Sequence, residues 1–171
     1  MLRRAMRLVR MDASGPDLFW LNRDLAISGT RNPDHWPVIF DAGIRYVVDL
    51  TRPDRDRAAG VRQNGMRYLA LCIEPGAIPR PEELHILSRW AIDRMNEQGR
   101  VLIQDSNSRF NDGLVAVAIL VKSGLPAHLA LLALRRARPE LRLDREQSAV
   151  LVRFATDLSV DAEDLTEVTP G

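Results

Sequence analysis

The sequence contains few of the residues that build disulfide frameworks or metal centres. Cys72 is the only cysteine among 171 residues, which excludes a disulfide framework and a cysteine-rich zinc module. The three histidines, His35, His85 and His128, are far apart and lack the spacing of metal ligands. We therefore expect no metal and no cofactor.

Long apolar runs and a surplus of one charge are also missing. No run approaches the roughly 18 apolar residues of a membrane-spanning helix, so we expect no membrane span. A net charge of +1 gives no reason to expect a nucleic-acid partner. The first residues, MLRRAMRLVRM, lack the apolar stretch of a secretory signal, which together with the single cysteine predicts a cytoplasmic protein.

The two ends of the chain carry opposite charge. Residues 1–16 contain four arginines, and residues 157–171 contain five acidic residues and no basic one. With 46% hydrophobic and 27% charged residues, the chain as a whole has an ordinary globular composition. We predict a basic N-terminal arm (1–16), one domain (17–156) and an acidic C-terminal tail (157–171).

Strand and helix patterns alternate along this domain. Short apolar or β-branched runs predict strands at 18–21, 25–27, 44–50, 66–72 and 101–103. Apolar residues at helical spacing, with proline, aspartate or glycine at the ends, predict helices from 32 and at 54–62, 81–99, 113–121, 126–138 and 144–156. Such alternation predicts an α/β sandwich with a largely parallel sheet.

The polar loop after the last strand is where we expect the chemistry. Residues 101–113 (VLIQDSNSRFNDG) form a strand, a polar loop and the start of an apolar helix. Ligands of open α/β sheets bind at the carboxyl ends of the strands. A loop of backbone N–H groups that leads into a helix N-terminus also favours anions.

Five segments resemble the cysteine-dependent dual-specificity protein phosphatases, in that family's order. They are WLNRDLAISG, AGIRYVVDLTRP, YLALCIEPGAIPRPEEL, VLIQDSNSRFNDG and LLALRRARPELRLDREQSAVLVRF. The resemblance extends over about residues 18–155. It implies a phosphatase-type three-layer sandwich, in which helices flank a central, mostly parallel sheet of about five strands.

The family signature is His-Cys-x-x-Gly-x-x-Arg-Ser/Thr-Gly, and its chemistry uses a thiolate nucleophile, an arginine clamp and an aspartic acid. On this sequence the signature positions hold Gln104, Asp105, Ser108, Asn111, Asp112 and Gly113. Only Gly113 agrees with the signature. Pro75 occupies the position of the acid, and Glu74 would serve only if the register shifts by one residue.

These replacements imply loss of the family's chemistry. A carboxylate is a poor nucleophile toward phosphate esters without a metal. The like charges of Asp105 and a bound phosphate would cost about 4 kcal/mol per pair at about 4 Å and an effective dielectric of about 20. The resemblance thus implies a pseudophosphatase, a binding or regulatory module with a protein partner.

Several alternatives for the loop remain open. In the first alternative, the Asp105 carboxylate is a built-in anion that accepts hydrogen bonds from the N–H groups of the loop, and Asp112 is the N-cap of the next helix. The loop would instead read a phosphorylated ligand through Ser106, Asn107, Ser108, Arg109 and Gly113. A third alternative is a weakly active phosphate-ester hydrolase that uses Asp105 or Glu74, and a variant of it has a metal held by Asp105, Asp112 and Glu74.

Four residues outside the loop carry further expectations. Arg52 and Arg55 follow a strand and would add positive charge to the cleft. Cys72 is expected to be a small buried apolar residue. His85 is expected on an exposed helix without a partner.

Overall fold

The fold is built around a five-stranded sheet with the order β1-β2-β5-β3-β4. The computed structural model describes residues 15–29, 32–105 and 110–166. The strands are β1 (Phe19–Trp20), β2 (Leu25–Ser28), β3 (Ile44–Asp49), β4 (Arg67–Ala70) and β5 (Arg100–Gln104). β1 pairs with β2 antiparallel and the other pairs are parallel, which confirms the predicted mostly parallel sheet.

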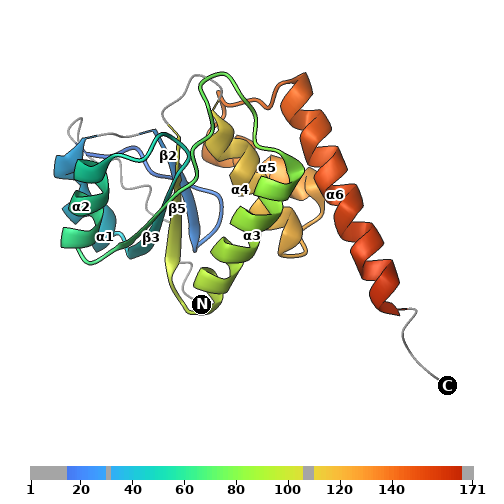
Figure 1. The fold of residues 1–171 in the computed structure, drawn as a ribbon, viewed down its shortest axis with the longest axis horizontal. Helices are drawn as coiled ribbons and strands as arrows, with labels where there is room; N and C mark the ends of the chain where they lie inside the picture. Colours follow the sequence, from blue (N-terminus) through green and yellow to red (C-terminus); the bar gives the residue numbers. More distant parts are fainter. Residues whose placement is uncertain (1–14, 30–31, 106–109, 167–171) are drawn as a thin grey trace, which may run out of the picture.

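Helices cover both faces of this sheet and give three layers (Figure 1). The helices are η1 (Pro33–His35, a 3-10 turn), α1 (Trp36–Asp41), α2 (Arg55–Gln63), α3 (Pro81–Asn96), α4 (Asn111–Lys122), α5 (Ala127–Ala137) and α6 (Arg145–Thr166). The first two α-helices lie on one face, and α3 to α6 lie on the other. This arrangement confirms the predicted α/β sandwich.

The central strands supply side chains to two separate apolar cores. In β5, Val101 and Ile103 belong to the core beneath α3 to α6, whereas Leu102 belongs to the core beneath α1 and α2. Successive side chains of a strand point to opposite faces, so a strand covered on both sides must be apolar at every position. This requirement explains why these runs are recognisable as buried strands in the sequence.

Helix α4 lies at the centre of the second helical layer. Its first ten residues, from Asn111 to Leu120, are all buried, as the apolar sequence of this segment predicted. It contacts α3, α5 and α6 as well as the sheet. Because α4 follows β5 directly, its N-terminus lies at the carboxyl edge of the sheet.

Helix α6 extends beyond its predicted end at residue 156. It continues to Thr166, into the segment assigned to the acidic tail. Leu151, Phe154 and Leu158 all contact the core, so the apolar spacing of the helix persists past the predicted end. A reciprocal cap starts the helix, in which the Asp144 N–H donates to Gln147 Oε1 at 3.0 Å and the Gln147 N–H donates to Asp144 Oδ1 at 2.9 Å.

In the part of the chain that the structure describes, no helix has the length and apolar character needed to cross a bilayer.

Candidate functional site

Buried polar residues gather where β3 and β5 end. Asp49 and Gln104 are register partners on these strands, and the Leu50 N–H donates to the Gln104 carbonyl at 2.9 Å. Asp49, Gln104 and Asp105 are all buried. This is the sheet edge where ligands bind in open α/β folds. Three side chains expected in the site, Gln104, Asp105 and Asn111, therefore lie at that edge.

Asp105 follows β5 and faces the first turn of α4. Its side-chain oxygen Oδ2 accepts a hydrogen bond of 2.8 Å from the Asn111 N–H. The first N–H groups of a helix have no partners within the helix and form its positive end, so a carboxylate is stabilising there. One bond of the built-in anion hypothesis is thus present.

Asp112 does not cap α4, so that expectation was wrong. The N-cap is Phe110, which has a φ of 52° and no capping side chain, and Asp112 is the second residue of the helix. The acceptor expected from Asp112 comes instead from Asp105, the residue after strand β5. The helix consequently begins two residues earlier than its apolar pattern predicted.

The Asn111 side chain is committed to internal bonds. Its Nδ2 donates to the Ala77 carbonyl at 3.0 Å, and its Oδ1 accepts from Gln147 Nε2 at 3.1 Å. Asn111 is 1% exposed. These bonds connect the loop before α3 to α6. The position that holds the phosphate-binding arginine in the resembled family is thus part of the protein's internal scaffold.

Asp112 is fully buried and only loosely paired. Its Oδ1 accepts from the Gly113 N–H at 2.9 Å, and its Oδ2 has no hydrogen bond within the described residues. Arg138 Nη1 lies 3.8 Å from Oδ2. Burial, together with the charge of Asp105, raises the pKa of Asp112 to about 7.

Arg138 covers this buried carboxyl group. Its guanidinium lies between two aromatic rings, 4.8 Å from the centroid of Phe19 and 4.9 Å from that of Phe110. Such cation–π contacts hold a guanidinium in place even where its ion pair is long. Its Nε also donates to Glu140 Oε1 at 2.8 Å, so Arg138 lies between an exposed carboxylate and the buried Asp112.

Gly113 packs closely against the side chain of Leu141. A β-carbon at this position would lie 2.8 Å from Leu141 Cδ2 and 3.1 Å from Leu141 Cδ1. The Gly113 N–H is engaged by Asp112 Oδ1 and by the Phe110 carbonyl at 3.2 Å. Of the residues predicted to bind an anion, the other four lie outside the described residues; they are Ser106, Asn107, Ser108 and Arg109.

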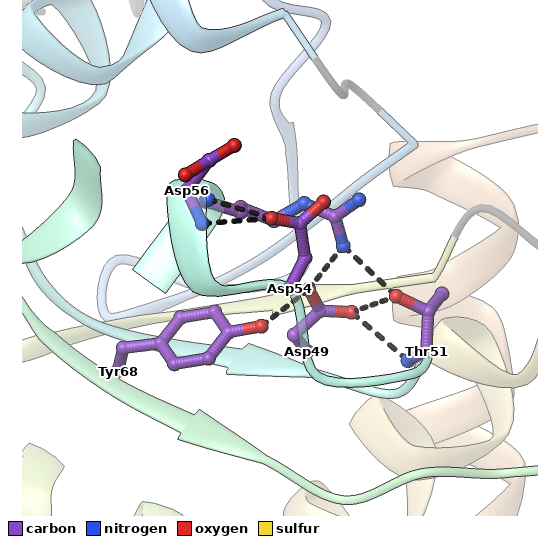
Figure 2. Close-up of polar contacts among 6 residues, drawn as sticks. Asp49, Thr51, Asp54, Asp56 and Tyr68 are labelled. Atoms are coloured by element: carbon purple, nitrogen blue, oxygen red, sulfur yellow. Dashed lines mark hydrogen bonds and ion pairs between the residues drawn. The ribbon is translucent and has the colours of Figure 1, made fainter. Parts of the chain in front are cut away.

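A second polar cluster, which the sequence did not indicate, surrounds Asp49 (Figure 2). Asp49 Oδ1 accepts from the Thr51 N–H at 2.9 Å and the Thr51 hydroxyl at 2.6 Å. Asp49 Oδ2 accepts from the Tyr68 hydroxyl at 2.8 Å and from Arg57. Burial and the bond to Asp49 raise the pKa of Tyr68. The only sequence signal was an aspartate at the end of an otherwise apolar strand.

A pocket of about 400 Å³ opens beside this cluster. Arg52, Arg55 and Arg57 line it from the β3–α2 segment, and Ile73 and Pro75 line it from the loop after β4. The first two arginines are those expected to add positive charge to the cleft. Arg57 was missed because its helical position gave no indication that Asp49 would hold it.

The loop after β4 holds two exposed residues of interest. Cys72 is exposed, so its expected burial was wrong: β4 ends at Ala70, two residues before it. Glu74 is 66% exposed in its side chain and lies 3.7 Å from Arg52. In the described part of the chain, Asp105, Asp112 and Glu74 do not form a group able to hold a metal ion.

His85 has neighbours that the sequence did not indicate. Its Nδ1 lies 3.5 Å from Lys122 Nζ, its Nε2 lies 3.8 Å from Asp157, and its ring packs on Phe154. The expectation of a partnerless histidine was therefore wrong, because α6 extends far enough to cover this part of α3.

The solved structures that this chain resembles include several phosphatases. The active form of Tk-PTP has a TM-score of 0.72 and 26% identity, covering 82% of this chain and 97% of that one. PTPMT1 in complex with PI(5)P has a TM-score of 0.76 and 16% identity, covering 85% and 99%. A mouse putative dual specificity phosphatase complexed with zinc tungstate has a TM-score of 0.76 and 21% identity, covering 91% and 96%.

These likenesses show that the chain has the phosphatase-type α/β fold, and they support the superfamily resemblance found in the sequence. Neither a family model nor a curated protein matches the sequence.

Proposed function

We propose that this protein is a pseudophosphatase, a dual-specificity-phosphatase-like domain that binds a protein partner and does not hydrolyse phosphate esters. The observation that carries the proposal is the buried carboxylate of Asp105, hydrogen-bonded to the Asn111 N–H at the start of α4. The positive end of this helix is thus already occupied by an anion that belongs to the protein.

The nucleophile position argues against the family's chemistry. Attack by Asp105 on phosphorus would require a carboxylate to approach a dianion without a metal between them. Asp112, also buried, lies close enough to Asp105 for the two charges to interact. Phosphate entering this loop would therefore meet like charge where the family presents a thiolate and an arginine.

The clamp position argues the same way. Arginine binds phosphate through a planar fork of N–H donors, whereas asparagine offers one amide. The amide of Asn111 is already hydrogen-bonded to Ala77 and Gln147. Releasing it to a ligand would break the bond to the Ala77 carbonyl and leave the buried Gln147 amide unsatisfied, at a cost of about 1–3 kcal/mol for Gln147.

A turnover measurement tests the proposal. p-Nitrophenyl phosphate and a phosphotyrosine peptide are incubated with the protein, with and without Mg²⁺ or Mn²⁺. We expect rates equal to those of the Asp105→Ala variant under every condition. Saturable turnover that Asp105→Ala abolishes would support the hydrolase alternative and overturn the proposal.

A thermal shift measurement asks whether Asp105 fills the loop. Phosphate, sulfate and vanadate are added to the wild type and to Asp105→Ala. Ligand at about 100 times its dissociation constant stabilises a protein by about 2.7 kcal/mol. We expect anions to stabilise Asp105→Ala more than the wild type, because only the variant's loop is open to an anion. If binding at the loop raised the melting temperature of the wild type as much as that of the variant, the result would favour the alternative in which the loop binds a phosphorylated ligand.

A further inference from the structure

The arginine pocket beside the Asp49 cluster has a rigid cationic wall. Arg57 is the fixed member: its Nη1 donates to Asp49 Oδ2 and, at 2.9 Å, to the Thr51 hydroxyl. Its side chain is 13% exposed, and both of these hydrogen bonds to described side chains come from Nη1. A guanidinium anchored by one nitrogen presents its other donors in a fixed orientation.

The other two arginines are free to turn toward a ligand. Arg55 is exposed and has no ion pair within the described residues. Arg52 has only a loose, exposed contact of 3.7 Å with Glu74, of the kind that contributes little energy. Asp54, the acidic residue of the pocket, is committed elsewhere because its carboxylate accepts the Asp56 and Arg57 N–H groups.

The loop after β4 adds apolar residues to the pocket. Ile73 and Pro75 line it together with the arginines, and its volume is about 400 Å³. A pocket of this size exceeds the needs of an inorganic anion and falls within the range for small organic ligands. The arginines and the apolar residues together fit an anion that carries an organic group.

We propose that this pocket binds a phosphate monoester, with the phosphoryl oxygens on Arg57, Arg55 and Arg52 and the organic group against Ile73 and Pro75. The proposal rests on the proposed function in one respect: Asp105 keeps phosphate out of the loop, so phosphate binds to the arginines next to it. The interaction is binding without bond cleavage. The same ester occurs in small metabolites and in phosphorylated side chains of partner proteins.

Binding of phenyl phosphate, measured by calorimetry on the full chain, tests this site. We expect Arg55→Gln and Arg52→Gln each to weaken binding about tenfold, the value of a lost charge-assisted hydrogen bond. Arg62→Gln, an exposed arginine on α2 outside the pocket, is the matched control and should leave binding unchanged. Glu74→Gln should tighten binding about twofold, because it removes the carboxylate that competes for Arg52.

A phosphotyrosine peptide distinguishes the two sources of the ester. Tighter binding of the peptide than of phenyl phosphate indicates a partner's side chain, and equal affinity indicates a small ester; either result supports the site. Absence of binding, or binding unaffected by both Arg55→Gln and Arg52→Gln, overturns it.

The Asp105→Ala variant separates this proposal from the pseudophosphatase proposal. Binding of phenyl phosphate at the pocket should persist in this variant. If Asp105→Ala changes the binding and the arginine variants leave it unchanged, the anion binds in the loop. Turnover by the wild type would overturn only the pseudophosphatase proposal. Arg52 and Arg55 are at exposed positions, so their variants should fold like the wild type.

Discussion

Asp105 Oδ2 accepts a 2.8 Å hydrogen bond from the N–H of Asn111, six residues later in the chain. The bond joins the end of a buried strand to the start of the central helix. It satisfies an N–H that the helix itself leaves without a partner. The same geometry that stabilises the fold therefore places a negative charge where the resembled enzymes bind phosphate.

Replacing Asp105 should show how much this bond contributes. In Asp105→Ala the buried Asn111 N–H loses its acceptor, which costs about 1–3 kcal/mol of unfolding free energy. Asp105→Asn keeps an oxygen acceptor and relieves the charge repulsion with Asp112. We expect urea unfolding at pH 8 to rank Asp105→Asn above Asp105→Ala by at least 1 kcal/mol. Equal stabilities would mean that the bond contributes nothing.

The pH dependence of stability should reveal Asp112. Its pKa is about 7 in the folded protein, against an ordinary value of 3.8. Between these values the folded state holds a proton that the unfolded chain has lost. The unfolding free energy attributable to Asp112 should therefore fall as pH rises from about 4 to about 7, by up to about 1.4 kcal/mol per pH unit, and level off above.

Asp112→Asn isolates this contribution. The other titrating groups are present in both proteins, so their effects cancel when the variant is compared with the wild type. We compare the unfolding free energies of the variant and the wild type in urea at pH 5 and at pH 8. The difference, variant minus wild type, should be about 2–3 kcal/mol larger at pH 8 than at pH 5. Asp93→Asn, at an exposed position of α3, is the control and should show no such gain. A constant difference between Asp112→Asn and wild type would contradict the raised pKa.

The strands and the central helix were predictable because burial determines their composition. Val101, Leu102 and Ile103 are apolar whichever face each side chain occupies, and residues 113–121 are apolar around the whole helix. Patterns of this kind depend only on period and hydrophobicity. The resemblance then identified Asp105, Asn111 and Asp112 as departures from a phosphatase signature.

The contacts of those residues were not predictable, because they join segments far apart in sequence. Asn111 bonds to Ala77 and Gln147, and Asp112 lies beneath Arg138. No local pattern marks such pairs. The Asp49 cluster was missed for the same reason: Arg57 and Tyr68 reach Asp49 from a helix and from a neighbouring strand.

Arg138 should stabilise the protein in a pH-dependent way. Arg138→Met removes two cation–π contacts, the ion pair with Glu140 and the guanidinium that lies 3.8 Å from Asp112. We expect a loss of about 2 kcal/mol of unfolding free energy at pH 8. The loss should be smaller at pH 5, where Asp112 is protonated and needs no counter-ion. Arg135→Met, at an exposed position in the last turn of α5, just before Arg138, should have little effect at either pH.

The Asp49 cluster predicts two variants of very different cost. Tyr68→Phe removes one of four hydrogen bonds to a buried carboxylate, and we expect a loss of about 1 kcal/mol. Asp49→Asn leaves Arg57, which is 13% exposed, without its counter-ion, and we expect a loss of about 3 kcal/mol or more.

Chemical denaturation of both variants and of the double variant measures these losses. Because the two residues share one network, the double variant should lose less than the two single losses combined. Tyr46→Phe is the control, since its hydroxyl bonds the exposed Glu97 at 3.2 Å and should be nearly neutral. If Asp49→Asn proved no worse than Tyr68→Phe, Arg57 would not depend on the Asp49 charge, and the rigid wall of the arginine pocket would lose its physical basis.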